Sequence, residues 1–143
     1  MPAYDPTNIF AKILRGEIPC HRVLEDEVAL AFMDVMPRAE GHCLVIPKAP
    51  ARTILDLAPD LYAALALRVQ RVARAAASAF GSDGLTIQQF NEAAGGQEVF
   101  HLHVHVLPRL EGIALRPPGG PMADGALLAA QAEKIRAALD RVG

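Results

Sequence analysis

The chain has 143 residues, with fourteen Lys and Arg against sixteen Asp and Glu and a formal net charge of -2. This length is typical of one domain, so we expect a single unit over residues 1–143. The near balance of charge provides no basic face for nucleic acid. No segment free of charged residues exceeds ten residues, whereas a membrane-spanning helix needs about 20 apolar ones. We therefore expect neither a nucleic-acid partner nor a membrane.

The opening segment and the cysteines indicate the compartment. Residues 1–8 lack the basic and apolar regions of a secretory signal. Cys20 and Cys43 are the only cysteines, and they form no Cys-x-x-Cys pair. Two cysteines cannot build a disulfide scaffold for a domain of this size, so we expect a cytoplasmic protein.

The first third of the chain predicts one short helix and three strands. Asn8 is placed to cap a helix with apolar residues at positions 9, 10, 13 and 14, and Gly16 ends it. Short apolar runs bounded by turn residues indicate the strands. These cover residues 23–25, 28–32 and 43–46, with a loop over residues 34–41 before the third.

The rest of the chain predicts two substantial helices and two further strands. Residues 60–80 carry apolar side chains at helical spacing along one face. Residues 85–90 and 102–107 have the composition of strands, and a final helix is expected over residues 124–139. Together these elements indicate an α+β fold with a five-stranded, mostly antiparallel sheet, one long helix and one C-terminal helix. We expect the helices to cover one face of the sheet.

Three of the five histidines alternate with apolar residues near the last strand. Successive side chains of a strand point to opposite faces, so His101, His103 and His105 would share one face, with neighbouring Cα atoms about 6.7 Å apart. Each imidazole needs a polar partner once it leaves water, so that face lines something polar. A metal ion and an anion such as phosphate both meet this requirement. The turn Gly95-Gly96-Gln97, which exposes backbone N–H groups, favours the anion.

The same segment carries the most specific motif of the chain. It reads His101-Leu-His103-Val-His105-Val-Leu and resembles the signature of the histidine-triad (HIT) family of nucleotide-binding proteins. The agreement extends in order over about residues 8–109, which leaves residues 110–143 as a C-terminal extension. The other matching segments are Asn8-Ile-Phe-Ala-Lys-Ile-Leu-Arg-Gly-Glu-Ile-Pro, Phe32-Met-Asp-Val-Met-Pro, Gly41-His42-Cys-Leu-Val-Ile-Pro-Lys48, and Asn91-Glu followed by Gly95-Gly96-Gln97-Glu-Val-Phe.

The resemblance implies a reaction at phosphorus. The middle histidine, His103, would attack the α-phosphorus of a nucleotide and form a covalent nucleotidyl-histidine, which water then hydrolyses. His101, His105 and His42 would orient that ring and help to balance charge on the phosphate. The attack requires a neutral imidazole, and an ordinary pKa of about 6.5 leaves most of the ring neutral in neutral solution.

The resemblance also implies the residues that bind the nucleotide. Asn91 and Gln97 would donate to the nonbridging phosphate oxygens without adding net charge. Asp34 would accept hydrogen bonds from both ribose hydroxyls. The walls of a pocket for a purine base would come from four apolar residues, namely Ile13, Ile18, Phe32 and Val35.

Departures from the family pattern change some of these expectations. Many relatives open with a Cys-x-x-Cys pair that holds a structural zinc, but the corresponding residues are Asn8 and Ala11, so we do not expect that zinc. Glu98 replaces a Ser or Thr that touches phosphate in several relatives. Because an acid would repel phosphate, we expect its side chain to point away or its backbone N–H to make the contact. His105 replaces the Gln of uridylyltransferase relatives, which favours hydrolysis over transfer.

The leading hypothesis is a nucleotidyl hydrolase that cleaves an AMP-type purine nucleotide from a leaving group on its α-phosphate, with a nucleoside phosphoramidate as substrate. The alternative substrate is a dinucleoside polyphosphate, which can arrive with magnesium; no cofactor is otherwise required. A nucleotide-binding regulator with incidental turnover also stays open. A zinc hydrolase with His101, His103 and His105 as ligands fits a strand poorly, because the outer Cα atoms would stand about 13 Å apart. The family further implies a homodimer joined through the helix at residues 60–80 and an adjoining strand.

Overall fold

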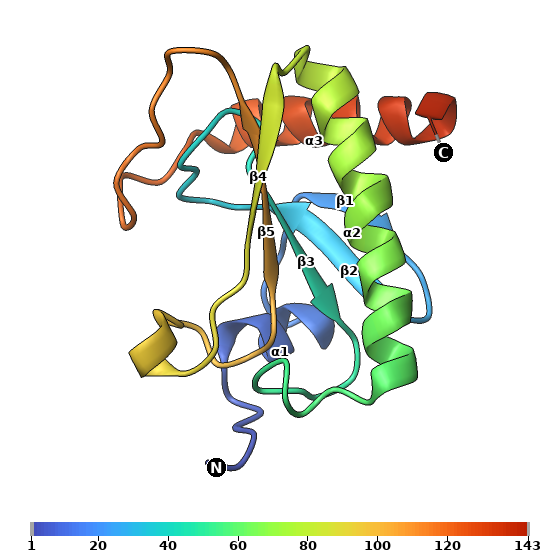
Figure 1. Cartoon of the computed structure of the whole chain (residues 1–143), viewed down its shortest axis with the longest axis vertical. Helices are drawn as coiled ribbons and strands as arrows, with labels where there is room; N and C mark the ends of the chain where they lie inside the picture. Colours follow the sequence, from blue (N-terminus) through green and yellow to red (C-terminus); the bar gives the residue numbers. More distant parts are fainter. Residues whose placement is uncertain (1, 143) are drawn as a thin grey trace.

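A computed structural model describes residues 2–142 of the chain (Figure 1). Its five strands form one sheet in the order β1-β2-β3-β5-β4, and every neighbouring pair is antiparallel. The α+β fold with a long helix and a C-terminal helix is therefore confirmed. The elements along the chain are α1 (Ile9–Leu14), β1 (Arg22–Glu25), β2 (Ala29–Met33), β3 (Cys43–Pro47), α2 (Pro59–Phe80), β4 (Gly84–Gln88), the short 3-10 helix η1 (Ala93–Gly95), β5 (Val104–Arg109) and α3 (Gly125–Val142).

The two long helices, α2 and α3, cover one face of the sheet, as expected, and build the larger core there. Strand residues alternate between the two faces, and Ala31 of β2 and Val45 of β3 point toward these helices. Apolar residues of α2 recur at helical spacing because one stripe of the helix faces the sheet. The buried residues that the helices contribute are Leu65, Val72, Ala73, Ala75, Ala76, Leu128, Ala132, Ile135 and Ala138.

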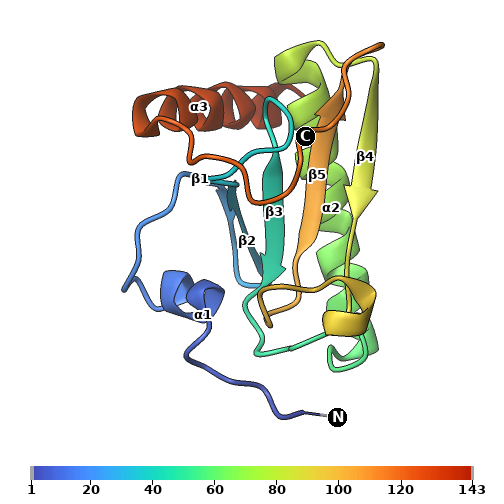
Figure 2. The ribbon, with the colours of Figure 1, turned by 90° about the vertical axis from the view of Figure 1, so that its left-hand side faces the viewer.

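The opposite face of the sheet carries a second, smaller core beneath α1 (Figure 2). Asn8 caps this helix as expected, because its side-chain oxygen accepts a hydrogen bond from the backbone N–H of Ala11 at 2.9 Å. Phe10 of α1 then reaches the sheet and packs edge-on against Phe32, with ring centroids 5.5 Å apart. The candidate functional site lies on this face.

The predicted strand over residues 102–107 is wrong at its start, because β5 begins only at Val104. The pairing of β3 with β5 ends where Val45 meets Val104. Beyond that point the backbone N–H of Leu102 donates to the carbonyl of Ala51 at 2.8 Å, away from the sheet. Pro47, at the end of β3, has no N–H with which to extend the ladder. His101 and His103 therefore precede the strand.

The other elements begin and end within three residues of their expected positions. The largest difference is in α3, which continues to Val142 where residue 139 was expected. In the described part of the chain, residues 2–142, no helix combines the length and apolar character that crossing a membrane requires.

A close contact joins the end of α2 to the loop before β3. Gly41 has a φ of +82°, and a Cβ added there would lie 2.6 Å from Cδ2 of Phe80, the last residue of α2. A side chain at this position would therefore be strained in its backbone and would collide with the aromatic ring. His42 follows Gly41 directly, so this contact helps to position a residue of the predicted site.

We expect Gly41→Ala to lower the free energy of unfolding by about 2 kcal/mol or more, because left-handed backbone strain adds to the displacement of Phe80. Gly16→Ala is the matched control: φ is +79° there, but no atom lies within 4 Å of the added Cβ. That variant should lose only about 1 kcal/mol, and urea denaturation measures both. Equal losses in the two variants would show that the Phe80 ring moves aside without cost.

Candidate active site

Four of the five histidines gather on the α1 face of the sheet, where β3 and β5 meet. His42 directly precedes β3, His101 and His103 precede β5, and His105 lies within it. The ring centroids of His103 and His105 are 5.1 Å apart, and those of His42 and His105 are 5.2 Å apart. The structure thus brings His42 together with the triad, as the family resemblance implied.

Both ring nitrogens of His101 are engaged in hydrogen bonds. Its Nε2 lies 2.8 Å from the carbonyl oxygen of Pro47, and a carbonyl can only accept, so Nε2 carries the proton. The hydroxyl of Tyr4 then donates to Nδ1 at 2.6 Å. His101 is fully buried and has no nitrogen left for phosphate or metal, an arrangement that suits a positioning residue.

His103 is held in one tautomer by the backbone. Its Nδ1 lies 2.6 Å from the carbonyl oxygen of His101 and must donate to it, so the lone pair resides on Nε2. The rings of Phe10 and His105 pack edge-on against His103, with centroid distances of 5.0 and 5.1 Å. A buried imidazole with a fixed orientation and a free lone pair is suited to act as a nucleophile.

His42 and His105 form a directed pair. The backbone N–H of Arg38 donates to Nδ1 of His42 at 3.1 Å, so the proton of His42 resides on Nε2. This Nε2 donates to Nδ1 of His105 at 2.9 Å, which leaves the proton of His105 on its own Nε2. His105 therefore presents an N–H donor beside the ring of His103, which presents a lone pair.

Burial favours the neutral form of all four rings. Loss of hydration lowers the pKa of His42 to about 3, with further lowering by the neighbouring His105 and Arg38. Burial also lowers the pKa of His101 and of His105 to about 4, and it lowers the pKa of His103. Nucleophilic attack needs the neutral imidazole, and burial favours this form of His103.

Asp34 lies at the edge of the histidine cluster. One carboxylate oxygen accepts from the backbone N–H of Met36 at 2.8 Å, and the other lies 3.5 Å from Nε2 of His42. Burial raises the pKa of this carboxyl group. Asp34, His42 and His105 offer ligand atoms within 4.8 Å of one another, a set that suits a divalent metal ion. Metal binding would require the His42–His105 hydrogen bond to open.

Gln97, expected to contact phosphate, is buried in the turn that leads to the triad. Its Nε2 donates to the carbonyls of Arg52 and Val99 at 2.8 and 3.0 Å, and its Oε1 accepts from the N–H of Glu92 at 2.7 Å. Glu92 has a φ of +61°, and the Arg52 guanidinium holds its carboxylate through two hydrogen bonds. The Gln97 side chain thus shapes this turn, and its contact with phosphate stays a prediction.

Asn91 is also engaged within its loop. Its Oδ1 accepts from the N–H of Ile54 at 2.8 Å, and its Nδ2 donates to Oε1 of Gln89 at 2.9 Å. Its role at phosphate likewise stays a prediction. Glu98, whose side chain was expected to point away from phosphate unless its backbone N–H makes the contact, is exposed.

The four residues expected to form a purine pocket differ in how deeply they are buried. Phe32 is buried in the small core beneath α1, and Ile13 packs against the same core. Ile18 is half-buried, and Val35 is 39% exposed. Phe10, which contacts both Phe32 and His103, connects this apolar surface to the nucleophile.

Several residues of the site were not predicted from the sequence. Tyr4 holds His101, the backbone of Arg38 holds His42, and Phe90 packs edge-on against His105 with centroids 5.7 Å apart. None of these lies in a motif that predicts chemistry. A place for Phe10 on the side of α1 that faces the sheet could have been predicted, because it follows the helix cap Asn8 on the apolar side of the helix.

An α+β fold with an antiparallel sheet, three alternating histidines and a fourth histidine just before a neighbouring strand is typical of a histidine-triad protein. This chain belongs to the HIT family, since the model of the HIT domain matches residues 15–112. The family belongs to a superfamily of nucleotide-binding proteins and hydrolases.

Relatives and solved structures agree with this assignment. The chain is 40% identical over 103 residues to the adenylylsulfatase HINT3 of Arabidopsis thaliana, covering 72% of this chain and 52% of that protein, so it spans about half of that relative. A HIT-like protein of Bartonella henselae, described as involved in cell-cycle regulation, is 50% identical with a TM-score of 0.92, covering 96% and 99% of the two chains. A zinc-bound histidine triad protein of Mycobacterium smegmatis is 34% identical with a TM-score of 0.81, covering 95% of each chain.

We expect the stability of the folded chain to fall as the pH drops from about 7 to about 5. The unfolded chain protonates its histidines near their ordinary pKa of 6.5, whereas in the folded chain burial holds the pKa of His42 at about 3 and that of His101 and His105 at about 4. The unfolded state therefore binds more protons below that ordinary value. Each such histidine should lower the unfolding free energy by about 1.4 kcal/mol per pH unit.

Urea denaturation across this pH range measures the slope. His105→Gln should make the slope shallower by the share of one histidine, whereas His21→Gln, outside the site, is the matched control. Identical slopes in wild type and His105→Gln would contradict the expectation that a neutral buried ring causes the acid sensitivity.

Proposed function

We propose that this chain is a nucleotidyl hydrolase that cleaves an AMP-type nucleotide from a leaving group on its α-phosphate. Nucleoside phosphoramidates are the leading substrate class. The observation that carries the proposal is the tautomer of His103, whose Nδ1–H is bound by the carbonyl of His101 so that the lone pair on Nε2 is available. A general binding site would have no need for a buried imidazole fixed in this way.

The reaction proceeds in two displacements. Nε2 of His103 forms a bond to the α-phosphorus as the bond from phosphorus to the leaving group breaks, and the leaving group takes up a proton from the solvent. The His103 ring becomes a nucleotidyl-imidazolium, whose positive charge is stabilised by the carbonyl oxygen of His101 on its Nδ1–H. The Nε2–H of His105 donates to a nonbridging phosphate oxygen. Water then attacks phosphorus and gives up one proton to the solvent, the bond from phosphorus to Nε2 breaks, and the nucleotide leaves the neutral His103 ring.

The apolar surface beneath α1 is the proposed site of the purine base, and the carboxylate of Asp34 is the proposed acceptor for the ribose hydroxyls. Both lie next to the histidine cluster, on the same face of the sheet. The reaction needs no metal, because the imidazoles supply both the nucleophile and the hydrogen-bond donor. The name of the Arabidopsis relative, an adenylylsulfatase, supports an adenylyl group as the group that is transferred and makes adenylyl sulfate a further substrate to test.

Turnover of three substrates tests this proposal: adenosine 5′-phosphoramidate, diadenosine tetraphosphate and adenylyl sulfate. We expect hydrolysis of the phosphoramidate to survive EDTA and to fall by at least about 10³-fold in His103→Ala, because the nucleophile is removed. His21→Ala removes a histidine outside the cluster and should keep wild-type turnover. Intact-protein mass spectrometry of acid-quenched wild type should detect the nucleotidyl adduct.

Other outcomes would redirect the assignment. Preference for the tetraphosphate would make the chain a dinucleoside polyphosphate hydrolase. Loss of turnover with EDTA would contradict a metal-free reaction and direct attention to Asp34, His42 and His105. Nucleotide binding without turnover of any substrate would support a regulatory protein, a role that the name of the Bartonella relative also suggests.

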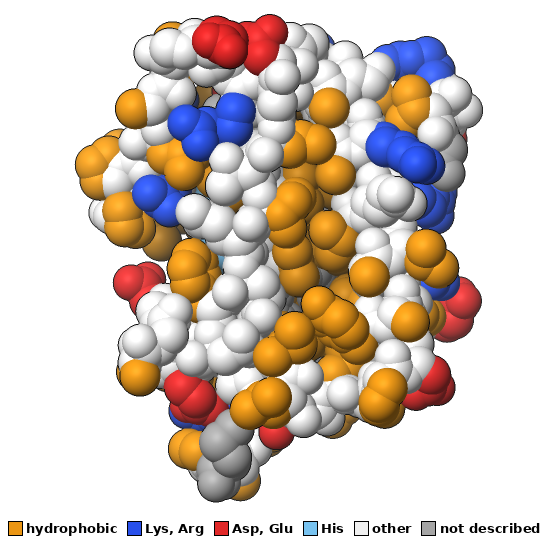
Figure 3. Space-filling view, in the orientation of Figure 1, with side chains coloured by type: hydrophobic (Ala, Val, Ile, Leu, Met, Phe, Trp, Pro, Cys, Tyr) orange, Lys and Arg blue, Asp and Glu red, His pale blue; other side chains and the backbone are white. Residues whose placement is uncertain are grey.

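We further propose that two copies of the chain associate through α2 and β4. Strand β4 lies at the edge of the sheet, and its Leu85 and Ile87 are 39% and 47% exposed. On α2, Tyr62 and Leu67 are 41% and 60% exposed. Figure 3 shows apolar side chains in a band over these two elements. An unpaired edge strand beside a continuous apolar band is the kind of surface that monomers rarely leave in water.

Leu67→Glu should convert the homodimer to a monomer, because it places an uncompensated charge within the apolar band. Leu127→Glu is the matched control, since Leu127 is also exposed, at 51%, but belongs to α3 and not to α2 or β4. Sedimentation velocity measures the mass of each variant. A wild-type chain that sediments as a monomer, or a Leu67→Glu variant that stays dimeric, would contradict this interface.

A further inference from the structure

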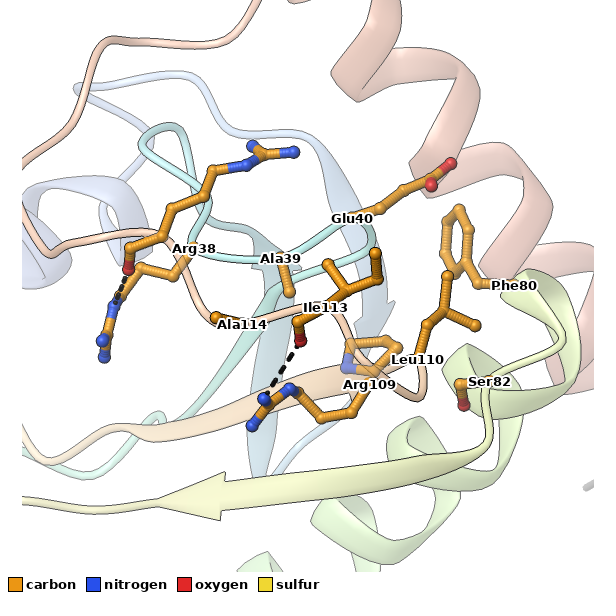
Figure 4. Close-up of a pocket in the computed structure, with 11 residues that line it drawn as sticks. Arg38, Ala39, Glu40, Phe80, Ser82, Arg109, Leu110, Ile113 and Ala114 are labelled. Carbon is orange, nitrogen blue, oxygen red and sulfur yellow. Dashed lines mark hydrogen bonds between the residues drawn. The ribbon is translucent and has the colours of Figure 1, made fainter.

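A cavity of about 270 Å³ lies on the sheet beyond the histidine cluster (Figure 4). It is enclosed by the last residue of α2, the end of β5, the loop before β3 and the segment at residues 110–116 that follows β5. On β5, His105 and Arg109 point to the same face and are four residues apart, so their Cα atoms are separated by about 13 Å. The cavity is therefore distinct from the proposed nucleotide site.

Three arginines line this cavity and bind only uncharged oxygens. Arg109 donates to the hydroxyl of Thr86 and the carbonyl of Ile113, and Arg38 donates to the carbonyl of Arg116 and the side-chain oxygen of Gln88. Arg116 donates to the carbonyl of Pro37. Within residues 2–142, no ion pair engages any of the three guanidinium groups.

A buried hydroxyl at the other end of the cavity has no partner. Ser82 lines the cavity where α2 gives way to β4, and its Oγ is the one buried side-chain oxygen or nitrogen in the described part of the chain without a hydrogen bond. A buried polar group left unpaired costs free energy, and such groups are rare in folded proteins. A ligand that accepts from this hydroxyl, or donates to it, would remove that cost.

The remaining walls are apolar apart from Glu40, whose carboxylate points away from Arg109 (Figure 4). Leu110 and Ile113 lie between Arg109 and Ser82, and Phe80 lies beside Leu110. Phe80 is held against Gly41, so this wall has a fixed position. Cationic groups around an apolar interior match a ligand with an acidic group on an apolar body.

We propose that this cavity is a second ligand site, which takes a small organic anion with an apolar body. The guanidinium groups of Arg109 and Arg116 bind the acidic group, and Phe80, Leu110 and Ile113 enclose the apolar part. Ser82 completes the polar contacts. The proposal does not depend on the hydrolase activity, because none of these side chains belongs to the histidine cluster.

Titration calorimetry with octanoate tests the site. We expect octanoate to bind at least about tenfold more tightly than octan-1-ol, which lacks the charge, or inorganic phosphate, which lacks the apolar body. Arg109→Gln and Arg116→Gln should each weaken octanoate by about tenfold through loss of a charged hydrogen bond. Arg74→Gln, at an exposed position on α2 outside the cavity, is the matched control and should bind like wild type.

Two further variants keep the test decisive. Ser82→Ala should weaken octanoate about threefold without lowering the melting temperature of the free chain, because the hydroxyl has no partner to lose. His103→Ala should bind octanoate as wild type does, even if the hydrolase proposal fails. Equal affinity for octanoate and octan-1-ol, or unchanged affinity in both cavity arginine variants, would overturn the proposal.

Discussion

Burial disfavours a charged ring, so hydrogen bonds decide which nitrogen of each imidazole carries its single proton. Backbone carbonyls accept hydrogen bonds from His101 and His103, and His42 donates one to His105, which leaves the proton of His105 on its Nε2. Since every tautomer follows from one of these bonds, the nucleophile and the hydrogen-bond donor are determined together. A change at one ring therefore alters the proton position on its neighbours.

One face of the sheet stabilises the fold, and the other carries the histidine cluster. Helices α2 and α3 bury one face in a continuous apolar core, which stabilises the strands. The other face is covered only by the short α1 and by loops, so polar rings can be placed there at the edge of a small apolar core. The backbone at residues 101–103 leaves the sheet just before β5, and this departure frees the carbonyl of His101 to accept from His103.

The sequence predicted the architecture well because its signals were local. The cap at Asn8, the apolar stripe at residues 60–80 and the glycines between elements each determine structure within a few residues. The histidine motif likewise identified the cluster. Sequence reasoning missed Tyr4 and the backbone of Arg38, because their contacts join residues far apart in the chain or use groups that every residue carries. It also assigned His103 to a strand, since alternation alone does not show where a ladder ends.

The packing of Phe80 on Gly41 connects helix α2 mechanically to the histidine cluster. Helix α2 has 22 residues and is therefore a rigid rod about 33 Å long. Its last residue, Phe80, packs against Gly41, which directly precedes His42. A shift of this helix along its axis would move the loop that carries His42 and, through it, the ring of His105. In the proposed homodimer the same helix lies at the subunit interface, so the two sites are joined by a stiff element. Cooperativity between subunits would then require no movement of the sheet.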